Sequence, residues 1–170
     1  IHTPYGVVLY AVDYKFDEYI NYGNNVVLQV GEEMFIHAVN KNGTNLVQGL
    51  PVSITGSTGQ TPQFVLATNT DVDLAHKTIG ILTEDILNNA KGKITNFGLV
   101  RGLDTSAWLE GDFLYVGNGV LTNVKPVAPT PLIEIGVVLA SSPTQGIILV
   151  NVHKAHSLDY ISDVEIVTPK

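Results

Sequence analysis

The chain has 170 residues, enough for one well-packed domain and short for two of ordinary size. Nine Lys and Arg residues against 16 Asp and Glu residues give a formal net charge of −7, which disfavours nucleic acid as a partner. The chain contains no cysteine, which excludes disulfides, thiolate nucleophiles and cysteine-ligated zinc.

Hydropathy favours association. Hydrophobic residues make up 45% of the chain and charged residues 15%, with a mean hydropathy of +0.21, so little polar surface is left to cover a monomer. The longest apolar runs, at 7–12 and 147–150, are far below the roughly 18 residues that span a bilayer, and no membrane association is expected. Because the chain begins at Ile1 without a leader, we expect a processed product or a fragment.

Residues 1–24 are predicted to form an extended arm. They hold five of the seven tyrosines, a side chain that suits interfaces because its ring packs while its hydroxyl stays hydrogen-bonded. An alternative is that these aromatic side chains cover an edge of the domain's own core. The arm residues predicted at contacts are Val7, Val8, Leu9, Tyr10, Tyr14 and Phe16.

Residues 25–152 are predicted to form an all-β module, a small barrel or sandwich of short strands with one or two helical turns. Asn42-Gly43 marks a tight turn, and residues 56–59 a loop. Helical pieces are expected at 71–76 and 84–90, with Asp71 and Thr83 as N-caps. The predicted strands cover residues 25–30, 33–39, 50–55, 63–68, 78–82, 94–101, 112–116, 120–122, 132–140 and 145–152. Residues 153–170 are predicted to be a polar exit segment.

Three predicted strands carry an internal glycine: Gly80, Gly98 and Gly136. Glycine weakens a strand, so its recurrence indicates sharp bends or the close approach of another backbone. We interpret the three strands as equivalent elements of one barrel.

In residues 93–123, β-prone runs and turn residues alternate more closely than elsewhere in the chain, and this segment holds the only tryptophan. They are interpreted as a barrel corner in which Gly98 and Gly102 permit the bend and Asp104 and Thr105 cap the turn. Trp108 is predicted to close the barrel end or fill a subunit contact. The alternative is that its ring stacks on a ligand such as a sugar.

The sequence signals for a metal site or a catalytic site are weak. His153 and His156 could share one face of a helical turn and bind a metal, but further ligands are lacking, and both are expected to decorate the exit segment. Ser57 and Ser106 do not lie in a G-x-S-x-G elbow. Neither a catalytic residue nor a cofactor or metal site is predicted, and the chain is expected not to be an enzyme. The carboxylate pairs Asp71/Asp73, Glu84/Asp85 and Glu110/Asp112 are interpreted as caps and solvated turns.

The run GLVRGLDTSAWLEGDFLYV at residues 98–116 resembles a pattern, G-x-V-x-G-L-D-T-S with E-G-D-x-L-Y, that recurs in tailed-bacteriophage structural proteins. The similarity continues in KTIGILTEDI at 77–86, IGVV at 135–138, TQGIILV at 144–150 and HSLD at 156–159. It covers roughly residues 49–164 in order and leaves out the first 48 residues.

The resemblance implies a virion structural protein: a β-barrel module of a tail fibre or spike, or of a head fibre or capsid decoration protein. Such modules commonly form trimers, attach to other virion proteins, and are made in the host cytoplasm. One alternative is a host-glycan-binding module that uses Trp108 with the turns at 104–106 and Asn118. Another is a polysaccharide depolymerase, which the missing carboxylate constellation argues against.

Overall fold

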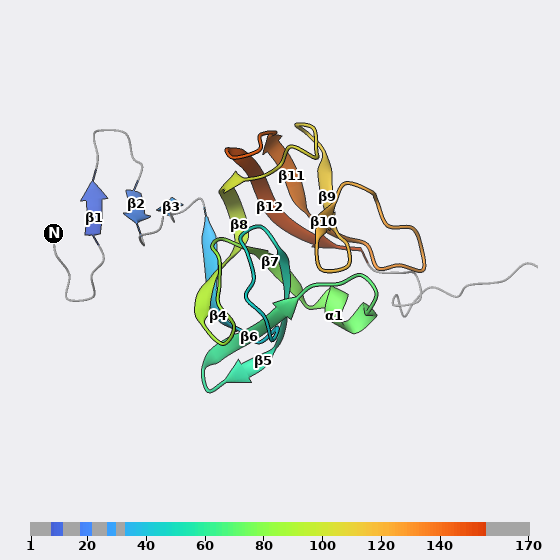
Figure 1. Cartoon of the computed structure of the whole chain (residues 1–170), viewed down its shortest axis with the longest axis horizontal. Helices are drawn as coiled ribbons and strands as arrows, with labels where there is room; N and C mark the ends of the chain where they lie inside the picture. The colour runs from blue at the N-terminus through green and yellow to red at the C-terminus, as the bar shows by residue number, and fades with distance from the viewer. Residues whose placement is uncertain (1–7, 12–17, 22–26, 30–32, 156–170) are drawn as a thin grey trace, which may run out of the picture.

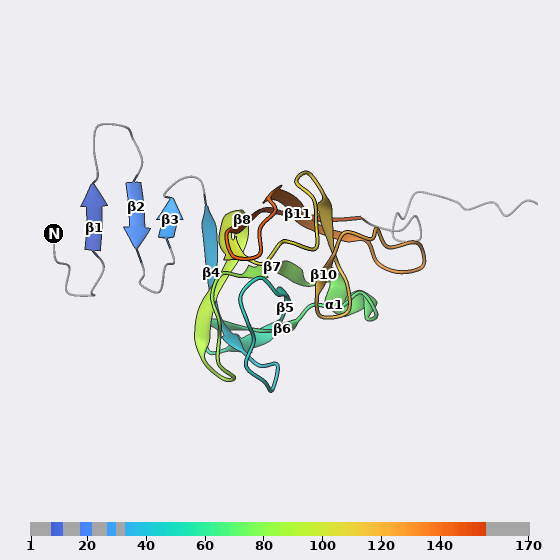
Figure 2. The ribbon, with the colours of Figure 1, turned by 45° about the horizontal axis from the view of Figure 1, so that its top comes forward.

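A computed structural model describes residues 8–11, 18–21, 27–29 and 33–155, and their side chains from Glu33 onward. The first three strands, β1 (Val8–Ala11), β2 (Glu18–Asn21) and β3 (Val27–Gln29), form an antiparallel sheet in the order β1-β2-β3. Two of these strands lie in the predicted arm, and Figures 1 and 2 show them beside the main body. The predicted contact residues Val7, Tyr14 and Phe16 lie outside the described residues, as do the side chains of Val8, Leu9 and Tyr10.

The remaining strands form one sheet that closes partly into a barrel. Its order is β10-β9-β11-β12-β8-β4-β6-β5-β7, and β7 pairs a second time with β8. Strands β4 to β8 therefore close a five-stranded barrel, and β12, β11, β9 and β10 extend β8 into what we call the outer sheet. This confirms the predicted all-β class with a small barrel. The elements are β4 (Met34–Asn40), β5 (Pro51–Thr58), β6 (Thr61–Leu66), α1 (Val72–His76), β7 (Thr78–Leu82), β8 (Lys91–Leu103), β9 (Phe113–Val116), β10 (Leu121–Thr122), β11 (Ile133–Ala140) and β12 (Gly146–Lys154).

The long strand β8 belongs to both parts. Its first half, to Phe97, pairs with β4, and its second half, from Phe97 to Leu103, pairs with β12. Gly98 lies where the partners change, with φ +114°, and a Cβ there would lie 2.6 Å from Cγ of Glu33. Only glycine adopts this conformation readily beside so close a neighbour, which confirms the bend predicted at Gly98.

One side chain from each barrel strand fills the barrel interior: Ala38, Val52, Phe64, Leu82 and Ile94. Leu46 and Ile86 join this core and pair through two backbone hydrogen bonds of 3.0 and 2.8 Å. The helical piece predicted at 84–90 is therefore wrong, because Ile86 is buried and forms an isolated β-bridge with Leu46. The predicted N-cap at Thr83 is wrong as well, since its hydroxyl is hydrogen-bonded to that of Thr95, 2.8 Å away. The cap at Asp71 is confirmed by its hydrogen bond from Leu74 N at 2.9 Å.

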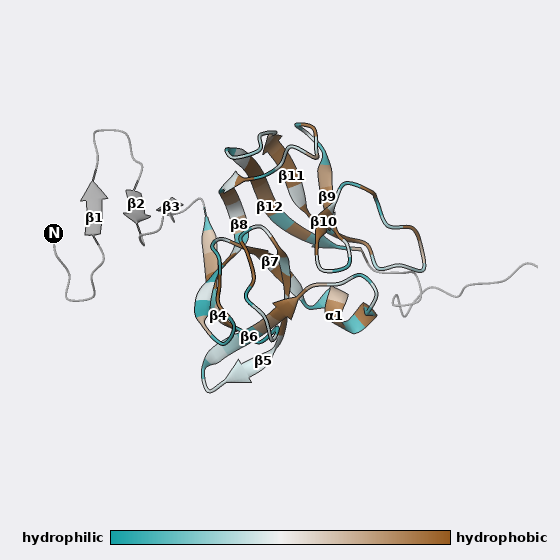
Figure 3. Ribbon diagram, viewed as in Figure 1, coloured by the Kyte–Doolittle hydropathy of each residue, from teal (hydrophilic) through white to brown (hydrophobic). Residues whose placement is uncertain are grey.

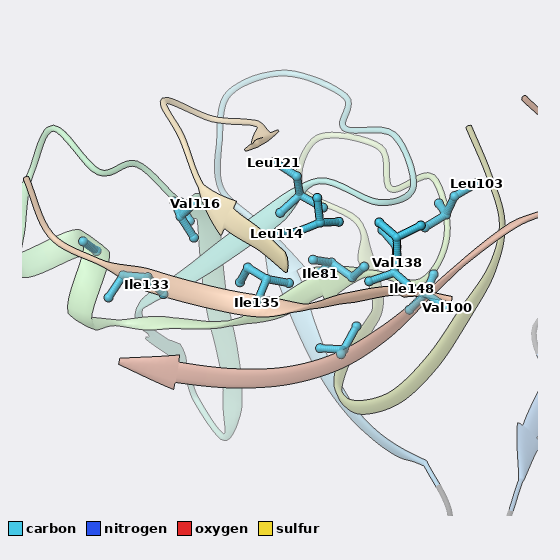
Figure 4. Close-up of a cluster of buried hydrophobic side chains, with 13 residues drawn as sticks. Ile81, Val100, Leu103, Leu114, Val116, Leu121, Ile133, Ile135, Val138 and Ile148 are labelled. Carbon is cyan, nitrogen blue, oxygen red and sulfur yellow. The ribbon is translucent and has the colours of Figure 1, made fainter. Parts of the chain in front are cut away.

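A second core lies between the outer sheet and β7. Figure 4 shows Ile81 of β7 among side chains of the outer strands, including Leu114, Ile135 and Ile148. Alternation along β7 sends Leu82 into the barrel and Ile81 into this second core. Both faces of β7 are thus buried, and the two cores share one wall.

Two of the predicted strand glycines are sites of close backbone approach. A Cβ at Gly80 would lie 2.0 Å from the carbonyl oxygen of Thr95, and one at Gly136 would lie 1.9 Å from that of Leu149. The interpretation of three equivalent barrel strands is wrong, because β11, which carries Gly136, lies in the outer sheet. The loop predicted at 56–59 is wrong in part, since β5 continues to Thr58.

Candidate interaction surfaces

The corner at residues 104–112 is organised around one buried hydroxyl. Thr105 is fully buried, and its Oγ1 donates to the carbonyl oxygen of Ala140 at 2.7 Å. Thr105 Oγ1 also accepts from Ser142 N at 3.0 Å, while Thr105 N donates to the Ser142 carbonyl oxygen at 2.8 Å. These bonds tie the corner to the connection between β11 and β12. The turn-capping role predicted for Thr105 is therefore wrong, because its hydroxyl bonds a distant segment of the chain instead of the local turn.

Asp104 closes the local turn before this anchor. Its carboxylate accepts from Ser106 N at 3.0 Å and from Ser106 Oγ at 2.6 Å. Both bonds favour the charged carboxylate, and they hold the pKa of Asp104 below its ordinary value of 3.8. The turn-capping role predicted for Asp104 is confirmed.

The lowered pKa of Asp104 makes a small contribution to stability that is fully present above pH 3.8 and is lost as the pH falls through the lower folded-state value. We therefore expect Asp104→Asn to melt below the wild type at neutral pH and to approach it in acid. Melting temperatures of both proteins between about pH 3 and pH 6 check this. A gap that stays constant or widens in acid contradicts it.

Trp108 is half-buried and packs against the second core. Its backbone carbonyl oxygen accepts from Ser141 Oγ at 2.7 Å, and its backbone N–H donates to the Thr105 carbonyl oxygen at 3.0 Å. The side chain therefore covers part of the second core and not the barrel interior, so the prediction that Trp108 closes the barrel end is wrong. Asn118, the other residue of the glycan alternative, accepts from Thr68 Oγ1 at 2.9 Å in the turn between β9 and β10.

The outer sheet presents an apolar row on the face that points away from the second core. Four neighbouring strands, β8, β12, β11 and β9, each contribute one residue to this row, and each residue is the direct cross-strand partner of the next. We call these residues the outer apolar row: Leu99, Leu149, Val137 and Phe113. Phe113 is 51% exposed, and the other three are half-buried. Leu139 and Phe97, also exposed, lie on strands of the same sheet.

The sequence interpretation missed this row, although a signal for it exists. A strand with one solvated face alternates apolar and polar residues, whereas β11 and the first half of β12 are apolar or glycine at nearly every position, as in IEIGVVLA and GIILV. Figure 3 shows β11 largely brown and β12 brown in its first half and teal toward its end, in contrast to the pale tip of the β5–β6 hairpin. This pattern is typical of strands covered on both faces.

A groove of about 360 Å³ opens on the barrel between the β5–β6 hairpin and β8. His37 of β4 and Lys93 of β8 are cross-strand partners beside it. Lys93 Nζ lies 3.3 Å from Glu84 Oε1, which also accepts from Lys93 N at 3.1 Å. The groove is lined by His37, Gln60, Thr61, Pro62, Glu84, Lys91, Gly92 and Lys93.

The predicted acidic pairs form structural hydrogen bonds, some local and some between distant segments. Asp85 accepts from Gln48 N at 2.8 Å, and Asp112 accepts from Leu109 N at 3.0 Å. Within the described ranges, no three His, Asp or Glu side chains gather as a metal site. The helical turn considered for the two histidines is wrong at His153, which lies in strand β12 opposite Glu134, whereas His156 lies outside the described residues. β12 thus runs two residues past the predicted end of the module at 152.

No protein-family model, curated protein or solved structure matches this chain. Among the residues that the structure describes, no helix is long and apolar enough to cross a membrane. Assignment of a function therefore depends on the surfaces described above and on the sequence resemblance.

Proposed function

We propose that the protein is a structural component of a bacteriophage virion, of a tail fibre or spike or of a head fibre or capsid decoration protein. It acts by association: with copies of itself, as a homotrimer, and with other virion proteins. It is assembled in the host cytoplasm and resides in the virion. The resemblance of residues 49–164 to such proteins and the barrel fold support this proposal.

The observation that carries the proposal is the outer apolar row. Four apolar side chains side by side on a regular sheet face form a flat surface that a second sheet or subunit can cover. Burying apolar surface contributes about 25 cal/mol per Å², so covering the exposed half of the Phe113 side chain, roughly 100 Å², stabilises a contact by about 2.5 kcal/mol. The neighbours in the row add to this contribution.

The test is the double variant Phe113→Ser with Leu149→Ser. Light scattering should show the wild type as a trimer at micromolar concentration, and the variant should need a concentration about 10-fold higher or more to assemble, because two contact side chains are lost. Circular dichroism establishes that the variant keeps its strands.

A matched control removes two apolar side chains elsewhere on the surface. Val124→Ser with Val127→Ser changes exposed residues in the connection before β11 and should leave assembly unchanged. A wild type that stays monomeric at micromolar concentration contradicts the proposal. Equal assembly of the row variant and the wild type contradicts the role of the row.

A further inference from the structure

The groove on the barrel wall is rich in hydrogen-bond donors. Its lining includes the ammonium groups of Lys91 and Lys93, the His37 imidazole, the Gln60 amide and the Thr61 hydroxyl. These residues come from β4, the β5–β6 hairpin and β8, and both strands belong to the closed barrel. The barrel strands and the hairpin therefore hold the backbone of these donor residues around one groove.

The charge of the groove is opposite to that of the chain. The whole chain carries a formal charge of −7, whereas the groove is lined by two lysines and, within the described part of the chain, one carboxylate. That carboxylate, on Glu84, already accepts from Lys93 N and lies within 3.3 Å of Lys93 Nζ. The Lys91 ammonium then makes the groove locally positive.

Size and chemistry restrict what this space can hold. Its volume of about 360 Å³ is near the lower end of the range for small-molecule sites. Among the described residues that line it there is no Phe, Tyr or Trp, so it lacks the flat apolar surface on which a sugar ring or base would stack. A small, hydrated molecule with a negative group fits the lining better than an apolar one.

We propose that this groove binds a small hydroxylated anion through its carboxylate or phosphate group. Lys91 and Lys93 attract the anionic group, and the Gln60 amide and Thr61 hydroxyl bond the remaining oxygens. Glu84 positions Lys93 by holding its ammonium and its N–H. This binding activity goes beyond the proposed association, which does not require it.

The test is calorimetric titration of the full chain with three probes: inorganic phosphate, D-glucuronate and the neutral methyl glucoside. At least one anion should bind with an affinity that falls as salt is added, while the neutral sugar should not bind. Binding of phosphate alone identifies a phosphate ligand, and binding of glucuronate alone identifies a carboxylate ligand. Binding of neither anion at about 20 mM overturns the proposal.

Lys91→Gln is the decisive variant, because it removes one positive charge and leaves the Glu84–Lys93 pair in place. It should weaken anion binding about 5-fold or more. The matched control is Lys125→Gln, which removes an exposed lysine from the connection before β11 and should leave affinity unchanged. Equal weakening by the two variants, or none by Lys91→Gln, overturns the proposal. Assembly of the wild type is measured separately, so failure here is distinct from failure of the proposed association.

Discussion

Replacing Gly136 with alanine is expected to lower the free energy of unfolding by about 3 kcal/mol or more. The added Cβ would lie 1.9 Å from the carbonyl oxygen of Leu149, which belongs to the backbone of the neighbouring strand β12 and is not the movable end of a side chain. The substitution must therefore push apart β11 and β12, the hairpin that carries much of the second core. Urea unfolding at a fixed protein concentration measures the loss.

The control for this substitution is Gly56→Ala, also in a strand of the same sheet. A Cβ at Gly56 would meet nothing within 4 Å, so the free energy of unfolding should change by no more than about 0.5 kcal/mol. Gly80→Ala, in which the Cβ would lie 2.0 Å from the Thr95 carbonyl oxygen, should behave like Gly136→Ala. If all three variants unfold alike, close backbone approach is not the reason for these glycines.

Thr105→Val is expected to cost about 3 kcal/mol, although it preserves the shape of the side chain. Valine cannot donate to the Ala140 carbonyl oxygen or accept from Ser142 N, and both groups lose a partner beside a fully buried position. Each unsatisfied group costs about 1 to 3 kcal/mol. Thermal or urea unfolding of the variant measures the effect.

Thr144→Val serves as its control, since Thr144 is exposed in the turn before β12. This variant should differ from the wild type by no more than about 0.5 kcal/mol. A Thr105→Val protein as stable as this control would show that the buried hydroxyl does not anchor the corner. Thr105→Ser, which keeps the hydroxyl, should recover most of the lost stability.

The positions of the strands along the chain could be predicted because the signals that define them are local. Asn42-Gly43 and the 117–119 turn separate β-prone runs, and the three prolines between residues 123 and 131 exclude a strand there. The corner was predictable for the same reason, since Asp104 bonds a residue only two positions away. By contrast, the long-range partners of Thr105 in the β11–β12 connection carry no local signal.

Features that depend on tertiary contacts were not predictable. Residues 84–90 have a helix-like composition, but burying Ile86 in the barrel outweighs that weak preference. Membership of β11 in the outer sheet follows from pairing with β9 and β12, which a glycine pattern does not encode. The groove combines residues 37, 60–62, 84 and 91–93, and only the closed barrel brings these segments together.

The sharing of β8 has a consequence for how the chain can be divided. A cut after β8 keeps all five barrel strands but strips Val100 and Leu103 of the strands that cover them, and it leaves Ile81 facing water. A cut before β8 leaves β8 with the outer sheet, but it opens the barrel and separates β7, with its Ile81, from the second core. No single break between Met34 and Lys154 therefore yields two fragments that each keep a complete core. The two parts can therefore be exchanged or grafted only as one unit.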